Sequence, residues 1–352
     1  DLNLFYQPKN INFSTEVFRD YEETMMRNKG TALVITKPTY FKQFTWQRNY
    51  GVNYDLTSNL QLQYTANANA RIDEPIGSLG SEGSHDSIWH SIMGGGTMQN
   101  FQQVLSATWN PPINKLPYLD FLKVPITYRT TYNYLGTTQA LASQGSTLSN
   151  SMTLQGTANA NMQTLYNKIP LIRNAHNAGS KKNTASNTRG NPKKMKPTKA
   201  LTKQDSIAMA DSLKHEALLE KLRAIRDFSI RFVTCLKTAN AQYSLTTGNR
   251  LPGYMGEATI VGLDPTNLWT PGFNYLLGIH TDETAEYLLR NDLLPRDTLF
   301  NDAHENTFNQ TFSLQATLEP IRDFKIDVTC TQNYSSRDEY YYKYLSEWDR
   351  VE

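Results

Sequence analysis

Along much of this chain, apolar and polar residues alternate with a period of two. Between residues 44 and 56, six of the seven even positions are apolar or aromatic, and the odd positions carry only Thr, Gln, Asn, Gly and Asp. The alternation continues over residues 60–72, after a short turn at residues 57–59. Because successive side chains of a β-strand point to opposite faces, this pattern predicts strands with one apolar and one polar face.

Further segments repeat this pattern. They lie at residues 122–134, 150–162, 307–318 and 324–334, less cleanly at 228–240, and weakly at 11–21 and 101–109. A strand of about 13 residues tilted by about 40° rises about 33 Å, which is enough to cross the apolar band of an outer membrane. The predicted fold is all-β, a segment of a very large antiparallel transmembrane β-barrel with long loops and one short helical insertion.

The two faces predict two environments. Asn, Gln and Thr hydrogen-bond readily to water, so the polar face is expected to line a water-filled lumen and the apolar face to contact lipid. The predicted lumen-lining residues are Gln47, Asn49, Asn53, Gln61, Gln63, Asn67, Asn69, Arg71, Thr127, Arg129, Asn133, Gln155, Asn159, Thr311 and Gln315. The predicted lipid-facing residues are Trp46, Tyr50, Tyr54, Leu62, Tyr64, Ala68, Ile126, Tyr128, Leu154, Phe312, Leu314 and Ile326.

Changes of composition along the chain predict its organisation. Barrel strands and loops are expected at residues 1–173, a Lys-rich flexible linker at 174–205 and an amphipathic helix at 206–226. Residues 227–352 are expected to hold further strands, with a long loop at 241–306 that either caps the exterior or folds into the lumen. For the linker and helix, two interpretations stay open, a solvated tether and an arm that binds an anionic or protein partner.

Alternate connections between antiparallel strands must lie on opposite sides of the sheet. One side is expected to hold residues 57–59, 110–121, 163–227 and 319–323, and the other residues 73–100, 135–149 and 241–306. Three connections of the first set are short, and barrels keep their short turns on the periplasmic side. The sequence therefore predicts that the first set is periplasmic.

The composition argues against several other classes of protein. The 352 residues include 35 Lys and Arg against 33 Asp and Glu, a net charge of +2, so no overall basic character indicates nucleic acid. No stretch of about 18 apolar residues predicts a transmembrane helix. Cys235 and Cys330 are expected on opposite faces and unpaired. The chain is expected to be a mature fragment or one piece of a longer polypeptide.

Four short motifs contain chemical residue types without the spacing that their chemistry needs. They are Ser84-His85-Asp86, the set His85, Asp86 and His90, the run Gly94-Gly95-Gly96-Thr97, and the set Asp282, Glu283 and Glu286. Adjacent residues cannot form a catalytic triad, and the glycine run lacks the Gly-Lys-Ser/Thr ending of a phosphate loop. The acidic set lacks the alternating oxygen ligands of a calcium loop. No enzyme activity, cofactor or metal is predicted.

Several stretches together resemble the SprA/Sov family, the outer-membrane translocon of the type IX secretion system in Bacteroidetes. The stretches are Ala70-Arg71-Ile72-Asp73-Glu74-Pro75, Pro112-Ile113-Asn114-Lys115-Leu116-Pro117, Leu165-Tyr166-Asn167-Lys168-Ile169-Pro170, Leu251-Pro252-Gly253-Tyr254-Met255, Ala316-Thr317-Leu318-Glu319-Pro320 and Asp323-Phe324-Lys325-Ile326-Asp327. They follow the family's order over nearly the whole chain. The Lys-rich arm departs from the family's pattern, as does Phe273, where the family often has Trp after the glycine.

This resemblance implies a bacterial outer-membrane barrel of about 36 strands. Such a barrel is similar to a gated conduit that passes folded cargo proteins with a C-terminal secretion signal to the cell surface. The implied partners are that cargo, a smaller outer-membrane barrel at a lateral opening, a periplasmic plug protein, membrane lipid and, indirectly, an inner-membrane motor complex. No nucleic acid and no cofactor are implied.

Two other classes of protein share the alternating pattern. A self-contained outer-membrane barrel, a porin or an adhesin, would fold from residues 1–352 alone. A soluble or surface-layer β-sandwich would turn its apolar faces into a core instead of toward lipid.

Overall fold

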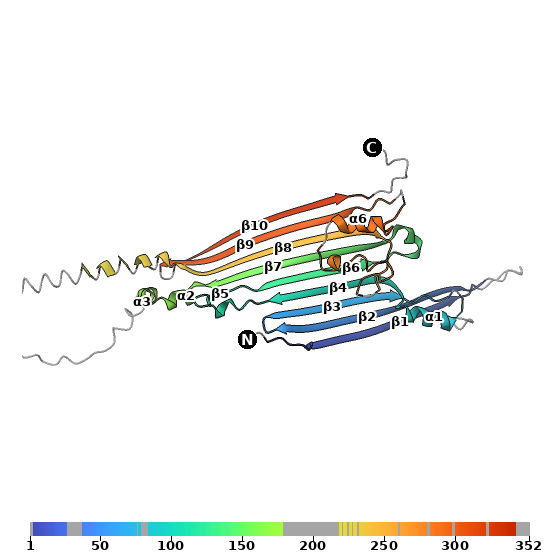
Figure 1. Ribbon diagram of the computed structural model, residues 1–352, viewed down its shortest axis with the longest axis horizontal. Coiled ribbons are helices and arrows are strands. Elements are labelled where there is room, and N and C mark those ends of the chain that lie inside the picture. Colours follow the sequence, from blue (N-terminus) through green and yellow to red (C-terminus); the bar gives the residue numbers. More distant parts are fainter. Residues whose placement is uncertain are drawn as a thin grey trace, which may run out of the picture.

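The described part of the chain forms one large antiparallel sheet. The computed structural model describes residues 3–26, 37–75, 77–78, 84–178, 218–219, 221–223, 225–226, 228–230, 232–259, 261–279, 282–297, 300–321 and 324–342. Within these residues, the strands lie in the order β1-β2-β3-β4-β6-β7-β8-β9-β10, and the short β5 pairs with β7 (Figure 1). Each of these strands pairs antiparallel with its neighbours, so the sheet is an open meander with β1 and β10 at its edges.

Most of the strands are long. Their bounds are β1 (Asn10–Thr24), β2 (Thr39–Thr57), β3 (Leu60–Arg71), β4 (Thr97–Trp109), β5 (Leu122–Lys123), β6 (Ile126–Leu135), β7 (Ser146–Asn161), β8 (Leu236–Tyr254), β9 (His304–Ile321) and β10 (Phe324–Tyr340). β2 and β8 reach 19 residues each, against about 5–6 residues in a typical globular strand. Pro125 separates β5 from β6 because proline has no N–H for the strand ladder.

Short helices lie at the two ends of the strands. Their bounds are α1 (Ser84–Met93), η1 (Ile113–Lys115), η2 (Gln139–Gln144), α2 (Met162–Lys168), α3 (Pro170–Ala178), α5 (Phe273–Leu276) and α6 (Asp282–Arg290). Figure 1 shows α2 and α3 at one end of the sheet and α1 and α6 at the other. α2 begins after Asn161, whose side chain accepts a hydrogen bond from the N–H of Gln163.

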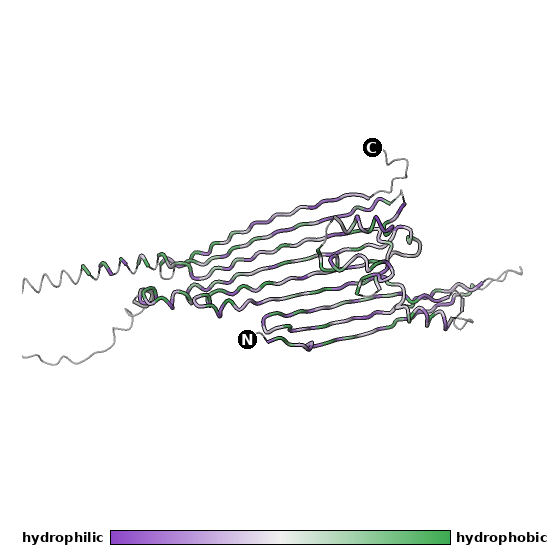
Figure 2. Tube along the Cα trace, viewed as in Figure 1, coloured by the Kyte–Doolittle hydropathy of each residue, from purple (hydrophilic) through white to green (hydrophobic). Residues whose placement is uncertain are grey.

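The register places side chains of one kind in rows that cross the whole sheet. In one row, Asn49 pairs with Asn67, then Asn67 with Gln102, and Gln102 with Asn133. A row on the opposite face runs through Tyr128, Leu154 and Leu245. Figure 2 shows hydrophilic and hydrophobic residues alternating along the strands. The predicted alternation therefore yields one polar face and one apolar face that are shared by all the strands.

One strand prediction is wrong in its position. Residues 228–230 and 232–233, assigned to a strand at 228–240, are helical, and β8 starts only at Leu236. Leu222, Ile225, Phe228 and Phe232 are spaced by three or four residues, so they fit a helix at least as well as a strand. Because β8 continues to Tyr254, the predicted loop at 241–306 shortens to residues 255–303, here called the insertion.

The predicted linker and helix fall largely outside the described residues. Of the linker at 174–205, the residues from 179 onward lie outside them, and so do residues 206–217 of the helix at 206–226. The residues of this helix that are described are helical. Residues 174–178 belong to α3, so the boundary at 173 divides a helix and does not mark the end of a strand.

The insertion packs on the apolar face at one end of the strands. Tyr132 Oη donates a hydrogen bond to the carbonyl of Gly262 at 3.0 Å, and the Asn150 amide donates to the carbonyl of Tyr275 at 2.9 Å. The core lies between sheet and insertion and includes Ala68, Phe101, Tyr132, Leu148, Leu251, Leu263, Tyr275 and Leu288. Each large apolar side chain buried there contributes about 1.5–3 kcal/mol. The insertion therefore lies on the apolar face and not on the polar face, which is the face predicted to line a lumen.

Polar side-chain contacts lie near the strand ends. After β3, the nearly buried Glu74 carboxylate lies 2.6 Å from Arg19 Nε and 3.8 Å from Lys42 Nζ, so it holds the start of the β3–β4 connection against β1 and β2. Across the β9–β10 pair, Thr317 Oγ1 donates to Asp327, its partner in the register, at 2.7 Å.

The close approach of the insertion to the sheet depends on Gly262, which has φ +80°. A Cβ added there lies 2.6 Å from Tyr132 and 2.8 Å from Phe101, whereas a Cβ added at Gly272, with φ +98°, meets nothing within 4 Å. We expect Gly262→Ala to destabilise the docked insertion by about 1–3 kcal/mol more than Gly272→Ala, because both carry the backbone strain and only one overlaps the sheet. Hydrogen exchange of residues 255–279 in the full-length protein measures this, and equal protection in the two variants would contradict it.

Candidate functional site

The polar face is the first candidate surface, and its residues are set by register. All fifteen residues predicted to line a lumen lie on it, because each stands in a polar row of the strand pairing. None of them is buried within the described structure. Neighbouring side chains bond to each other, with 3.2 Å between Asn49 Nδ2 and Ser14 Oγ and 3.2 Å between the hydroxyls of Thr153 and Thr246. Their role as lumen lining stays a prediction.

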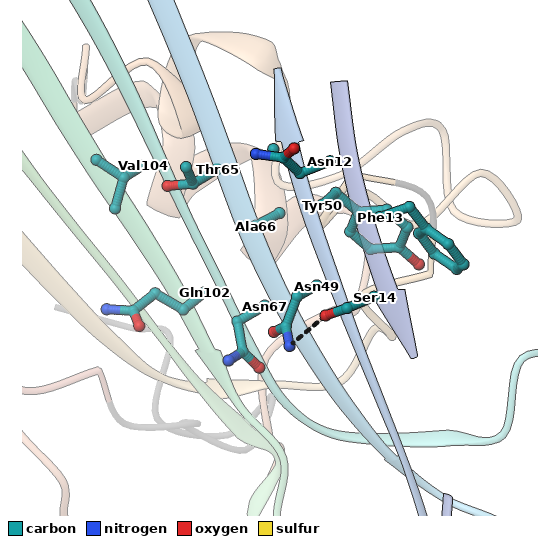
Figure 3. Close-up of a pocket in the computed structure, with 11 residues that line it drawn as sticks. Asn12, Phe13, Ser14, Asn49, Tyr50, Thr65, Ala66, Asn67, Gln102 and Val104 are labelled. Carbon is teal, nitrogen blue, oxygen red and sulfur yellow. Dashed lines mark hydrogen bonds between the residues drawn. The ribbon is translucent and has the colours of Figure 1, made fainter. Parts of the chain in front are cut away.

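A shallow hollow of about 370 Å³ lies on this face beside Gly51. The missing side chain of Gly51 leaves the space, since a Cβ there would stand 3.6 Å from Asn12. Figure 3 shows the amides and hydroxyls around it, with the hydrogen bond from Asn49 to Ser14. These groups donate and accept hydrogen bonds without carrying charge, so the hollow is suited to hold water and not to bind one ligand firmly.

Charged groups of the polar face pair with each other at the end of β8 to β10. Arg250 lies 3.4 Å from Glu305, and Arg337 lies 3.1 Å from Glu305 and 2.7 Å from Glu339. These side chains are partly exposed, so each pair contributes little stability, on the order of 0–1 kcal/mol. Their effect is to cancel charge locally.

The apolar face is the second candidate surface, and it has a covered and an uncovered part. Eleven of the twelve residues predicted to contact lipid lie on this face and are partly accessible. Ala68 lies on the same face, but it is only 2% exposed and belongs to the buried core cluster, between Arg48 and Phe101 of the neighbouring strands. Within the described structure, it is therefore not accessible to a partner on this face.

The uncovered part lies at the end of β6 to β10 that is opposite to the insertion, and along the edge strands β1 and β10. Phe13 and Val17 on β1 are 61% and 58% exposed, and Val328 and Tyr334 on β10 are 44% and 57% exposed. Large apolar side chains exposed in rows of this extent mark a surface that contacts another apolar phase or protein.

Several polar groups of the apolar face bond to the insertion. The Tyr275 hydroxyl donates to Asn249 Oδ1 at 2.7 Å, and Asn249 also bonds to Asn306 at 2.6 Å. Burial raises the pKa of Tyr275, so this hydroxyl stays protonated and acts as a donor. The network also includes His304, whose Nε2 lies 2.6 Å from the Asn249 amide nitrogen, and it joins the insertion to the sheet.

Asp264 organises the loop that lies over the sheet. Its carboxylate, 2% exposed, accepts hydrogen bonds from the backbone N–H of Glu257 at 3.1 Å and of Thr266 at 2.9 Å, and from the Asn267 amide at 2.6 Å. Burial alone would raise the pKa of this carboxyl, but the hydrogen bonds outweigh burial and hold the pKa below its ordinary value. The carboxylate is therefore charged at neutral pH.

The structure does not assemble the four weak motifs into sites. Ser84, His85, Asp86 and His90 lie on the single helix α1, and residues 94–96 form the turn that follows it. Asp282, Glu283 and Glu286 lie on α6, where Glu286 pairs with Arg290 at 3.3 Å. Cys235 and Cys330 are both free thiols. Among the described residues, no three His, Cys, Asp or Glu side chains gather as metal ligands.

Two features were missed in the sequence. The segment Ala239 to Leu245 alternates clearly, with Ala239, Ala241, Tyr243 and Leu245 on the apolar face, and placing a loop boundary at 241 concealed it. The second feature is the loop around Asp264, which lies over the sheet. Its residues carry no periodic signal, although Asp264-Pro265 is a common start of a turn.

Comparisons of this sequence with known protein families and with curated proteins found no match. In the described part of the chain, no helix is both long and apolar enough to cross a membrane.

The pKa of Asp264 predicts an acid-sensitive insertion. Its folded pKa lies below the unfolded value of about 3.9, so the carboxylate stabilises the insertion above that pH, and the stabilisation is lost as pH falls through the folded pKa. Asp264→Asn is expected to cost about 1–3 kcal/mol at pH 7 and to flatten the pH dependence below pH 4. Urea unfolding between pH 2 and 7 measures both effects. Asp86→Asn, at an exposed position of α1, is the control, and an equal loss there would refute the role of Asp264.

Proposed function

We propose that this chain is part of the wall of an outer-membrane channel that conducts folded proteins to the cell surface. The observation that carries the proposal is the division of one open sheet into a polar and an apolar face by rows that cross all its strands. A wall between lipid and a water-filled conduit needs this division. More specifically, we infer that this open sheet is a segment of a very large transmembrane β-barrel.

The open edges favour a segment over a complete small barrel. β1 and β10, of 15 and 17 residues, each pair on one side only within the described residues. Unpaired edges of this length associate readily with further strands. Strands from elsewhere in a longer polypeptide would satisfy them, whereas a self-contained porin or adhesin would need β1 to pair with β10.

Barrel size decides which cargo fits. At about 4.8 Å between strands and about 40° of tilt, 36 strands enclose a backbone cylinder about 70 Å wide. A folded domain of about 100 residues has a radius of gyration of about 13 Å, so it passes through such a cylinder. The uncharged amides and hydroxyls of the polar face bond to water as readily as to protein, so they keep the conduit wet without retaining cargo.

The resemblance to the SprA/Sov family supports the same proposal. The stretches that carry it include Glu74, which holds the connection after β3 against Arg19 of β1, and Thr317 and Asp327, which bond to each other across β9 and β10. The family's partners are proposed with it, namely cargo with a C-terminal secretion signal, a smaller barrel at a lateral opening, a periplasmic plug, an inner-membrane motor and lipid. The proposed role involves passage and no reaction.

Neighbouring positions of β9 test the orientation of the wall. Leu314 lies on the apolar face, near the middle of the part of β9 that the insertion does not cover. Gln315 lies next to it on the polar face. Leu314→Arg is expected to cost about 2–4 kcal/mol of membrane-inserted stability, and Gln315→Arg much less. Urea titration of the full-length protein in lipid vesicles measures both variants. Equal costs would refute the assignment of the faces.

Cargo protection tests the proposed conduit. In the full-length protein with Cys235 and Cys330 replaced by Ser, Asn67→Cys places a thiol on the polar face, and Ser58→Cys places one in the β2–β3 turn. A cargo stalled in transit is expected to slow labelling of Asn67→Cys by a membrane-impermeant maleimide about tenfold, because it fills the space in front of that face. Labelling of Ser58→Cys should not change. Unchanged labelling at both positions would contradict passage along this face.

A further inference from the structure

The apolar face changes its character along β2. Between residues 50 and 56, toward the β2–β3 turn, the even-numbered positions of this face are uncharged. Farther from the turn, cations and aromatic rings share the face on β2 and on its neighbour β1, at the end of the sheet where Figure 1 shows α1. We call this part the cationic patch, and it consists of Arg19, Tyr21, Lys42, Phe44, Trp46 and Arg48.

Each cation of the patch lies over an aromatic ring of the same face. The Arg19 guanidinium lies 5.4 Å from the centre of the Phe44 ring, and the Arg48 guanidinium lies 4.4 Å from the Trp46 ring. Lys42 Nζ lies 5.9 Å from the centre of a tyrosine ring of β1. This stacking positions the cations and leaves them charged. Aromatic rings with Lys and Arg are typical of the membrane–water interface, where the rings anchor the chain and the cations reach lipid headgroups.

Acidic groups neutralise the patch only in part. The Glu74 carboxylate lies between two of the cations, 2.6 Å from Arg19 Nε and 3.8 Å from Lys42 Nζ. Arg48 instead donates to the neutral carbonyl of Gly95 at 3.0 Å. Within the described part of the chain, no carboxylate pairs with Arg48, and its Nε has no hydrogen-bond partner. The patch therefore keeps a positive charge that an external anion can neutralise.

The distance along β2 places the patch at headgroup depth in the proposed barrel. At about 3.4 Å per residue and about 40° of tilt, Arg48 lies about 21 Å from the level of Leu56 at the turn, and Phe44 with its partner Arg19 lies about 31 Å from it. The apolar band of an outer membrane is about 25 Å tall, so the patch spans the edge of this band. The Arg19 side chain is 41% exposed and extends into the headgroup layer.

We propose that the cationic patch binds the phosphate headgroup of an anionic membrane lipid, with Arg19 and Arg48 as donors. The acyl chains of this lipid lie along the uncharged part of the same face, toward the β2–β3 turn. The other acid on this face of β1 and β2 is Glu23, which stands opposite Tyr40 at the far end, so the excess positive charge is centred on Arg48. This inference rests on the proposed function, because it requires lipid on the apolar face.

The test measures which lipid gathers at the patch. The full-length protein, with both native cysteines replaced by Ser, carries an environment-sensitive nitrobenzoxadiazole fluorophore at Val17→Cys, which lies beside Arg19 on the apolar face and is 58% exposed. It is reconstituted in phosphatidylcholine vesicles that contain phosphatidic acid or phosphatidylcholine with a nitroxide on the acyl chain. Phosphatidic acid is expected to bind at least threefold more tightly than phosphatidylcholine at this position, and added salt should lower the preference. Inorganic phosphate should not compete, because it lacks acyl chains.

A reference position and matched variants make the result specific. The same fluorophore at Leu314→Cys, on the uncovered apolar face of β9, is expected to show no preference between the two lipids. Arg48→Gln keeps a donor for the Gly95 carbonyl but removes the charge, so it should lower the preference at Val17→Cys at least threefold, as should Arg19→Gln. Arg129→Gln, an exposed arginine on the polar face, should leave it unchanged.

The outcomes separate this site from the proposed wall. Quenching of both fluorophores without a preference for phosphatidic acid, or an equal loss in Arg129→Gln, would overturn the site and leave the wall standing. Quenching at Leu314→Cys but not at Val17→Cys would show that a protein partner covers the patch, which also overturns the lipid site. No quenching at either position would refute the wall itself and this site with it.

Discussion

The structure depends on an uninterrupted strand register, because a shift by one residue would exchange the two faces of a strand. The pairing contains five irregularities, between Asp55 and Thr57, Asn69 and Ala70, Ser146 and Leu148, Leu236 and Thr238, and Phe324 and Ile326. Each lies within a few residues of a strand end. The central rows therefore stay in register across the sheet, and the side chains of each row stay on one face over its whole width.

The apolar face is covered by protein at one end of the sheet and exposed at the other. At the end that carries the insertion, the apolar face is closed by protein, and polar groups such as Asn150 and Asn249 are tolerated there because Tyr275 bonds to them. At the other end, the same face is apolar and uncovered. This division means that the residues beneath the insertion are constrained by packing, whereas those beyond it are exposed and are not constrained by contacts with the insertion.

The period-two signal predicted most strands, and it predicted the face of each residue that was named as lumen-lining or lipid-facing, because the strand register keeps alternate residues on opposite faces. Helical residues around Phe228 were misassigned since they fit both periods, and the end of β8 was placed too early. The burial of Ala68 was not predictable, because alternation tells which face a residue occupies and not what covers that face. The left-handed backbone conformations of Leu268 and Trp269 in the insertion were not predictable either, because they leave no periodic pattern in the sequence.

The insertion also restricts the order in which the proposed barrel could be assembled. It joins β8 to β9 and rests folded against the strands as far across the sheet as Tyr132 and Phe101. A hairpin with this folded mass at its tip could not be threaded through a closed barrel. In the proposed barrel, β8 and β9 would therefore have to be added, and the insertion would have to reach its final side, before the last strands paired.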